Sequence, residues 1–176
     1  MTEYTFHDKI RSYAVVEVFM NVTVASLTAI HAAVTGNGTL QTISASAQPD
    51  IPRNISITST GTHGGVSTIT GILATGQPSS EVITIVPGGT AYGSKAFAKV
   101  TSYTLPATLD ATDTLACGKS DKLGLSKILQ LATDVYKCKR NSADITVPAI
   151  DIINATINFA TIVANDDFTV WYTAVV

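Results

Sequence analysis

The chain has 176 residues, of which 45% are hydrophobic and only 14% are charged, and its formal net charge is −2. This length allows one domain with a substantial core, without help from disulfides or metals. The charge balance argues against a protein held on DNA or RNA by phosphate contacts, because such proteins carry a basic excess. The low charge predicts that partners cover part of the surface, as in an assembly subunit.

We expect no export or membrane signal in the N-terminal segment. Residues 1–13 are polar and lack the apolar region of a signal peptide. No uninterrupted apolar run reaches the ~18 residues that predict a transmembrane helix, so we expect no membrane partner. We expect residues 1–12 to form an N-terminal arm and residues 13–176 to form a single domain.

The first predicted element is a strand over residues 13–24, because apolar and polar residues alternate there. Glu17 and Asn21 lie on one face of this strand, and the other face is apolar: Val16, Val18, Met20, Val22 and Val24. The next segment, residues 26–34, fits either a few helical turns or a strand. It ends before the glycine-containing turn at residues 36–38.

Short alternating runs continue through the rest of the chain. Residues 66–73 and 81–86 are joined by a turn-rich loop and predict a hairpin. Further strands are predicted at 54–60, 97–105, 114–117, 128–136, 152–163 and 168–176. About ten strands separated by turns predict an all-β fold, either an antiparallel β-sandwich or a jelly-roll-like barrel.

The last run, residues 168–176, extends to the end of the sequence. A strand in this position must pair with something or it frays. One interpretation is that it adds to a partner, which makes Phe168, Val170, Trp171 and Tyr172 candidate interface residues. The other is that it lies inside the chain's own sheet.

Residues with catalytic or metal-binding chemistry are scattered. No His stands in a metal-binding motif, and the three are widely spaced: His7, His31 and His63. Three acidic residues are expected to serve as turn residues and not as calcium ligands: Asp110, Asp113 and Asp121. Phosphate loops and nucleophile motifs are missing. We therefore expect no enzyme activity, no cofactor and no metal. Cys117 and Cys138 form no CxxC motif, so their pairing stays open.

A proline-rich corner precedes the strand at 54–60. Pro49 and Pro52 favour extended backbone and cannot donate to a sheet, which predicts a crossover and not a central strand. Arg53 carries a rigid donor fork suited to carboxylates or carbonyls, and Asp50 is the nearest acid. We predict a structural corner made of Asp50, Pro52, Arg53 and Asn54.

Several motifs, in this order, resemble a family of small virion structural proteins of tailed bacteriophages: PDIPRNISIT, the hairpin GVSTITGILATG with EVITIVPGG, KAFAKVTSYTLPA and SDKLGL. The resemblance covers residues 48–125, and Ser120 replaces the family's glycine in the last motif. It implies a non-enzymatic capsid decoration (cement) protein on the virion surface. Its expected partners are the major capsid protein and further copies of itself, with a trimer favoured. The alternative within this resemblance is a neck or tail component, such as a tail tube, terminator or fibre base.

A third hypothesis is a carbohydrate-binding sandwich or a hydrolase. Such a site needs exposed aromatic side chains on one face. Trp171 and Tyr172 are adjacent and point to opposite faces, while Tyr92 and Tyr103 are distant in the sequence. Core packing therefore explains most of the aromatic residues better.

Overall fold

The computed structural model describes residues 12–175, and its fold is all-β, as predicted. The strands are, in chain order, β1 (Ser12–Val22), β2 (Ser26–Thr35), β3 (Gln41–Ser44), β4 (Arg53–Ser59), β5 (Gly65–Leu73), β6 (Pro78–Ile85), β7 (Thr90–Leu105), β8 (Thr114–Gly124), β9 (Val135–Arg140), β10 (Ala143–Ile145), β11 (Ala149–Asp151), β12 (Thr156–Asn158) and β13 (Asp166–Val175). One short 3₁₀ turn, Ala132–Asp134, precedes β9. The predicted arm, residues 1–12, falls almost wholly outside the described residues.

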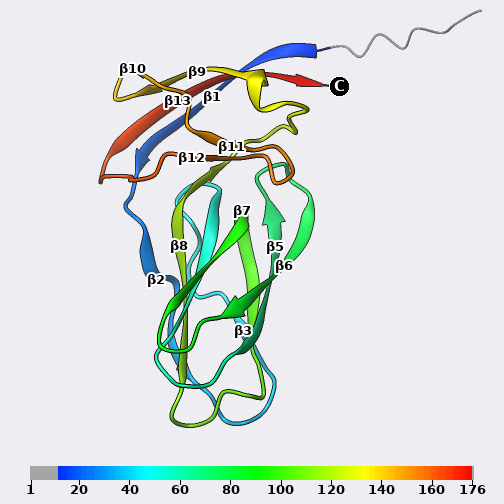
Figure 1. Ribbon diagram of the computed structural model, residues 1–176, viewed down its shortest axis with the longest axis vertical. Coiled ribbons are helices and arrows are strands. Elements are labelled where there is room, and N and C mark those ends of the chain that lie inside the picture. Colours follow the sequence, from blue (N-terminus) through cyan, green and yellow to red (C-terminus); the bar gives the residue numbers. More distant parts are fainter. Residues whose placement is uncertain (1–11, 176) are drawn as a thin grey trace, which may run out of the picture.

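Two antiparallel sheets pack together in a sandwich-like arrangement. The small sheet has the order β1-β13-β9-β10, and the large one the order β11-β12-β8-β4-β7-β5-β6, with β2 added to β8 and β3 to β7. Figure 1 shows the small sheet lying across the top, directly above β11 and β12. β8 runs from the far end of the molecule up to β12, so this strand belongs to both halves.

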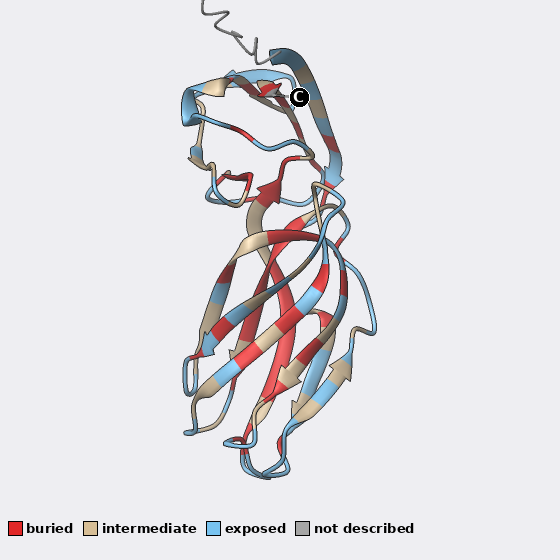
Figure 2. Cartoon of the chain, turned by 90° about the vertical axis from the view of Figure 1, so that its right-hand side faces the viewer, coloured by how far each residue is buried: buried red, intermediate tan, exposed pale blue. Residues whose placement is uncertain are grey.

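The buried side chains form two hydrophobic clusters, which define two lobes (Figure 2). In the small lobe, the inner face of the small sheet packs on β12 and the end of β8, through residues such as Phe168 and Leu123. In the large lobe, the curved large sheet encloses its own cluster, including Phe97 and Ile57. We call the region between the clusters, where the upper end of β8 meets the start of β4, the waist.

The predicted hairpin is confirmed, since β5 and β6 pair from Gly65 to Ile72. Residues 26–34 form a strand, which settles the choice between helix and strand.

Two of the strands expected from the sequence were wrong in part. Residues 128–134 form a loop and a 3₁₀ turn, because Asp134 Oδ2 accepts the backbone N–H groups of Gln130 and Leu131. Only residues 156–158 of the segment 152–163 are a strand, because the backbone turns at Ala155 and Ala160, both with positive φ.

The alternating apolar face of β1 points outward for most of its length. Val16, Val18 and Met20 are 55%, 55% and 64% exposed, whereas Phe19 on the other face is buried. A bulge between Phe19 and Val22 turns the backbone at Asn21, which has φ 53°, and so Val22 is buried again. This outward apolar face was not expected from the pattern alone.

Candidate functional site

The corner at residues 50–54 lies at the waist, where its arginine is fully buried. Arg53 Nη1 donates to the backbone oxygen of Thr23 at 2.6 Å and lies 3.5 Å from Asp50 Oδ1. On its other side, Arg53 Nη2 lies 3.9 Å from Asp121 Oδ1. A buried guanidinium needs such partners, because removing its hydration costs several kcal/mol. The arginine thus links the corner to the β1–β2 connection and to β8.

Asp50 extends this link with three further hydrogen bonds. Its carboxylate accepts Lys119 Nζ at 2.6 Å, and the backbone N and Oγ1 of Thr23, each at 2.9 Å. Burial raises the pKa of Asp50, but Lys119, Thr23 and the charge of Arg53 outweigh it and lower the pKa to about 2. Three segments distant in the sequence are therefore held together by one partly buried ionic cluster, which we call the waist cluster: Thr23, Asp50, Arg53, Lys119 and Asp121.

Asn54 connects the corner to the SDKLGL element. Its side chain donates to Gly93 O at 2.9 Å and accepts Lys122 N at 3.0 Å. Gly124 N donates to Pro52 O at 3.0 Å. A Cβ on Gly124 would lie 3.2 Å from Pro52 Cβ and only 2.6 Å from two alanine side chains, so this contact requires glycine. The PDIPRNISIT and SDKLGL segments are thus in direct contact.

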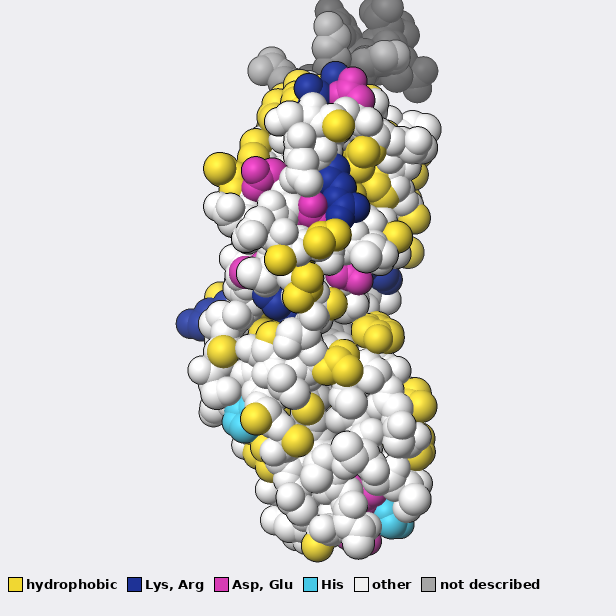
Figure 3. All heavy atoms as spheres, turned by 90° about the vertical axis from the view of Figure 1, so that its left-hand side faces the viewer, with side chains coloured by type: hydrophobic (Ala, Val, Ile, Leu, Met, Phe, Trp, Pro, Cys, Tyr) yellow, Lys and Arg dark blue, Asp and Glu magenta, His cyan; other side chains and the backbone are white. Residues whose placement is uncertain are grey.

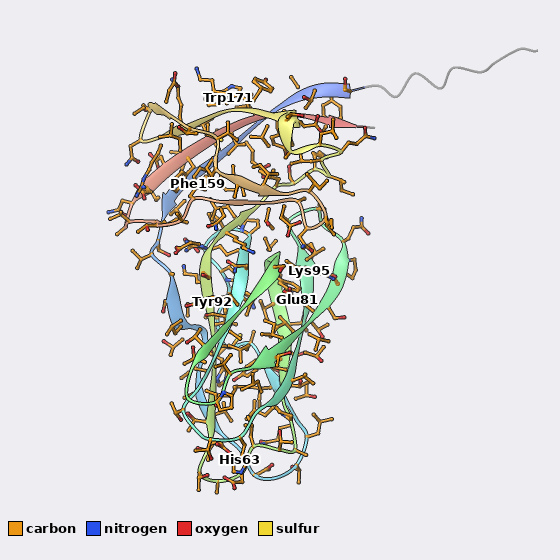
Figure 4. All side chains as sticks on the ribbon, viewed as in Figure 1. His63, Glu81, Tyr92, Lys95, Phe159 and Trp171 are labelled. Atoms are coloured by element: carbon orange, nitrogen blue, oxygen red, sulfur yellow. The ribbon has the colours of Figure 1, made fainter. Side chains whose placement is uncertain are left out.

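A pocket of about 310 Å³ opens beside this junction. Its lining is largely polar: Asn54, Tyr92, Ser120, Asp121, Lys122, Asn158 and Ala160. Figure 4 shows Tyr92 on the side of the large lobe, between the small sheet and the His63 end. Burial raises the pKa of Asp121 above its ordinary value, and the charge of Arg53 offsets only part of this effect. The pocket was not predicted, because its residues come from β4, β7, β8 and the segment 158–160.

The last strand, β13, lies inside its own sheet between β1 and β9, as the second interpretation expected. Phe168, Val170 and Tyr172 are fully buried in the small-lobe core. They are therefore not available to a partner while this fold persists. Tyr172 is also anchored, since its hydroxyl donates to Glu17 Oε2 at 2.8 Å.

Trp171 points to the outer face, with Lys137 Nζ 5.6 Å from its ring centroid. It pairs with Val16 across the strands, and so its side chain lies beside the apolar face of β1. We call this surface the β1 strip: Val16, Val18, Met20 and Trp171. β1 stands at the end of its sheet, and no strand within residues 12–175 pairs with its other side.

His63, Asp110 and Asp113 meet at the far end of the large lobe, with potential ligand atoms within 4.8 Å of one another. His63 Nδ1 lies 2.8 Å from Asp113 Oδ2, and Asp113 Oδ2 also accepts Asp110 N at 3.0 Å. These bonds tie two loops together, which is a structural use of the groups. Asp121 is not part of this cluster. It lies within β8 at the waist, so its expected role as a turn residue was wrong.

The two cysteines are free and lie in different cores, Cys117 in the large lobe and Cys138 in the small one. Burial raises the pKa of Cys117 to about 12 and that of Cys138 to about 11. Both thiols are therefore protonated at neutral pH and poor nucleophiles.

Known protein families, curated proteins and solved structures offer no match to this chain. Within residues 12–175, no helix is long and apolar enough to cross a membrane.

Proposed function

We propose that this chain is a non-enzymatic structural subunit of a bacteriophage virion, and specifically a decoration protein on the capsid surface. The β1 strip is the observation that carries this proposal. It combines exposed aliphatic side chains with an open strand edge, two features that proteins ordinarily cover or avoid. The resemblance of residues 48–125 to virion structural proteins of tailed bacteriophages supports the virion as the assembly to which the chain binds.

The strip suits a docking surface more than a solvent-facing one. Trp171 and Met20 offer large contact areas, and tryptophan in particular is enriched at the centre of interfaces. On the face shown in Figure 3, charged side chains gather on the small lobe and the waist, while much of the large lobe carries none. Because the β1 strip lies on the small lobe, we infer that this lobe contacts the major capsid protein or a second copy of this chain.

Binding only to the assembled shell would stabilise that shell by mass action, without any chemistry. A symmetric homo-oligomer, with a trimer favoured, would place several strips against neighbouring capsomers at once, which raises the overall affinity. This proposal requires neither a cofactor nor a metal, and it involves neither nucleic acid nor a membrane.

The test is the copy number of the chain on separated heads and tails from purified virions. A copy number comparable to that of the major capsid protein, travelling with heads, supports decoration. A small number of copies travelling with necks or tails favours the tail component instead. Absence from both fractions overturns the proposal of a virion subunit.

A further inference from the structure

The waist pocket has polar groups that the fold does not use. Within the described chain, the side chains of Tyr92, Ser120 and Lys122 make no hydrogen bond or ion pair. Asn158 Oδ1 accepts Ala160 N at 3.1 Å, which leaves its amide nitrogen available. A pocket with several converging unused donors and acceptors is typical of a site for a polar ligand.

The wall behind these groups is rigid. Both ends of the Asn54 side chain are hydrogen-bonded, and they hold Gly93 next to Tyr92 and the backbone of Lys122. Asp121 Oδ1 is buried opposite Arg53, and the side chain is 27% exposed. A preorganised site loses little conformational entropy when a ligand binds.

The character of the lining restricts the ligand. Asp121 and Lys122 carry opposite charges, so an anion and a cation would each meet a like charge. Tyr92, 59% exposed, adds an aromatic face beside the polar groups. Neutral sugars combine both requirements, because hydroxyls hydrogen-bond to carboxylates and amides while a C–H face packs on an aromatic ring.

We propose that the waist pocket binds a neutral carbohydrate, with one sugar ring packed on Tyr92 and hydroxyls bonded to Asp121 and Asn158. Two further hollows, of about 520 and 180 Å³, also include Asn158 in their linings. The three hollows therefore meet at β12, and an oligosaccharide can extend from the first pocket. This binding goes beyond the proposed capsid docking and uses residues separate from the β1 strip.

The test is an NMR titration of the isotope-labelled full chain with four neutral probes: N-acetylglucosamine, galactose, mannose and rhamnose. We expect saturable shifts of backbone signals at residues 120–122 and 158–160 with at least one probe. Tyr92→Ala should weaken this binding about tenfold or more, since it removes the aromatic contact. Tyr136→Ala is the matched control, because Tyr136 on β9 is 56% exposed, against 59% for Tyr92, and does not line the pocket.

Three outcomes overturn the carbohydrate proposal: no saturable shifts with any probe, saturable shifts that map elsewhere, or equal binding by Tyr92→Ala and the wild type. Glucose and glucose 6-phosphate are titrated as a further matched pair, and tighter binding of the anionic phosphate than of glucose also contradicts a neutral site. Head binding by Tyr92→Ala is measured in parallel. Because that assay depends on the β1 strip, failure of sugar binding and failure of capsid docking are distinguishable.

Discussion

The waist cluster buries charged side chains, whereas the β1 strip exposes apolar ones, and both arrangements differ from the usual distribution of side chains in proteins. At the waist, Arg53 and most of Lys119 are buried, although charged side chains normally face water. On the strip, Val16 and Val18 are exposed, although other valines are buried in both cores. The two regions lie in one small chain and are built from neighbouring segments, since Thr23 follows β1 directly.

The two regions differ in whether the rest of the chain supplies their contacts. The waist charges lie beside opposite charges of the same chain, since Asp50 accepts hydrogen bonds from Lys119 and Thr23 and two carboxylates lie within 4 Å of Arg53. Arg53 Nε and Nη2 and Asp121 Oδ1 make no hydrogen bond within the described residues. The strip finds no cover within the described residues. A buried charge with its partners indicates a structural role, and an exposed apolar face beside an open edge indicates a contact with another molecule.

Removing the waist arginine should give the largest effect. Arg53→Ala leaves Asp121 and the Thr23 carbonyl without their partner and opens a cavity, so we expect a loss of about 3 kcal/mol in the free energy of unfolding. Urea denaturation measures this loss. Lys99→Ala, at an exposed site on β7, is the control and should change the stability by less than about 0.5 kcal/mol. An unchanged stability of Arg53→Ala with lost head binding would instead make Arg53 an interface residue.

The sequence indicated the corner but not its full set of partners. Asp50 stands three residues before Arg53, so local spacing was enough to suggest that pair. Thr23 and Lys119 are 30 residues before and 66 residues after Arg53, and only the folded chain brings them together. Long-range contacts of this kind leave no periodic signal.

The two faces of β1 show a second limit of prediction from the sequence. Period-two alternation correctly separates two faces, but it does not tell which face is buried when both carry apolar residues. Val15 and Phe19 lie on the inner face together with Glu17, although a charged side chain more often faces solvent. Glu17 is accommodated because its carboxylate accepts the Tyr172 hydroxyl and Ser126 N.

Acid should lower the stability of the fold through the waist cluster, because the cluster contains the carboxylate of Asp50 and the β1 strip contains no titratable acid. Asp50 has a pKa of about 2 in the fold and 3.8 ordinarily, so its ionised form stabilises the protein near neutral pH. Because Asp50 is partly exposed, solvent screening reduces this contribution to about 1–2 kcal/mol. This contribution is complete above pH ~4 and is lost as the pH falls toward ~2, because the unfolded chain binds the proton first.

Thermal unfolding between pH 5 and 2 measures this dependence, at about one-unit steps. In Asp50→Asn, the part of the pH dependence of stability that comes from this carboxylate should vanish. Asp144→Asn, an exposed carboxylate beside Lys137, should keep the wild-type slope. An identical slope in Asp50→Asn and wild type would contradict the waist cluster as the acid-sensitive element.

The strip should respond in the opposite sense, with binding lost and stability kept. Val18→Lys places a charge on an already exposed position, so the free energy of unfolding should change by less than about 0.5 kcal/mol. Head binding should weaken by about tenfold or more, because a desolvated ammonium is costly in an apolar contact. Val82→Lys on β6 is the matched control, since Val82 is 62% exposed and lies on the large sheet, whereas the strip lies on the small one. Sedimentation with heads measures both variants, and equal binding by the two would remove the strip from the interface.

The smallest expected effect concerns the coupling of the two lobes. Cys138 reports on the small-lobe core and Cys117 on the large one, and both thiols are buried. If the waist cluster joins the lobes into one cooperative unit, both thiols should react with a thiol reagent at the same rate in mild denaturant, where opening limits the reaction. Mass spectrometry of digested protein gives each rate. In Arg53→Ala the rates should separate, because each lobe can then open by itself. Different rates in the wild type would show that the lobes unfold independently and that the buried charges join the lobes without coupling their stability.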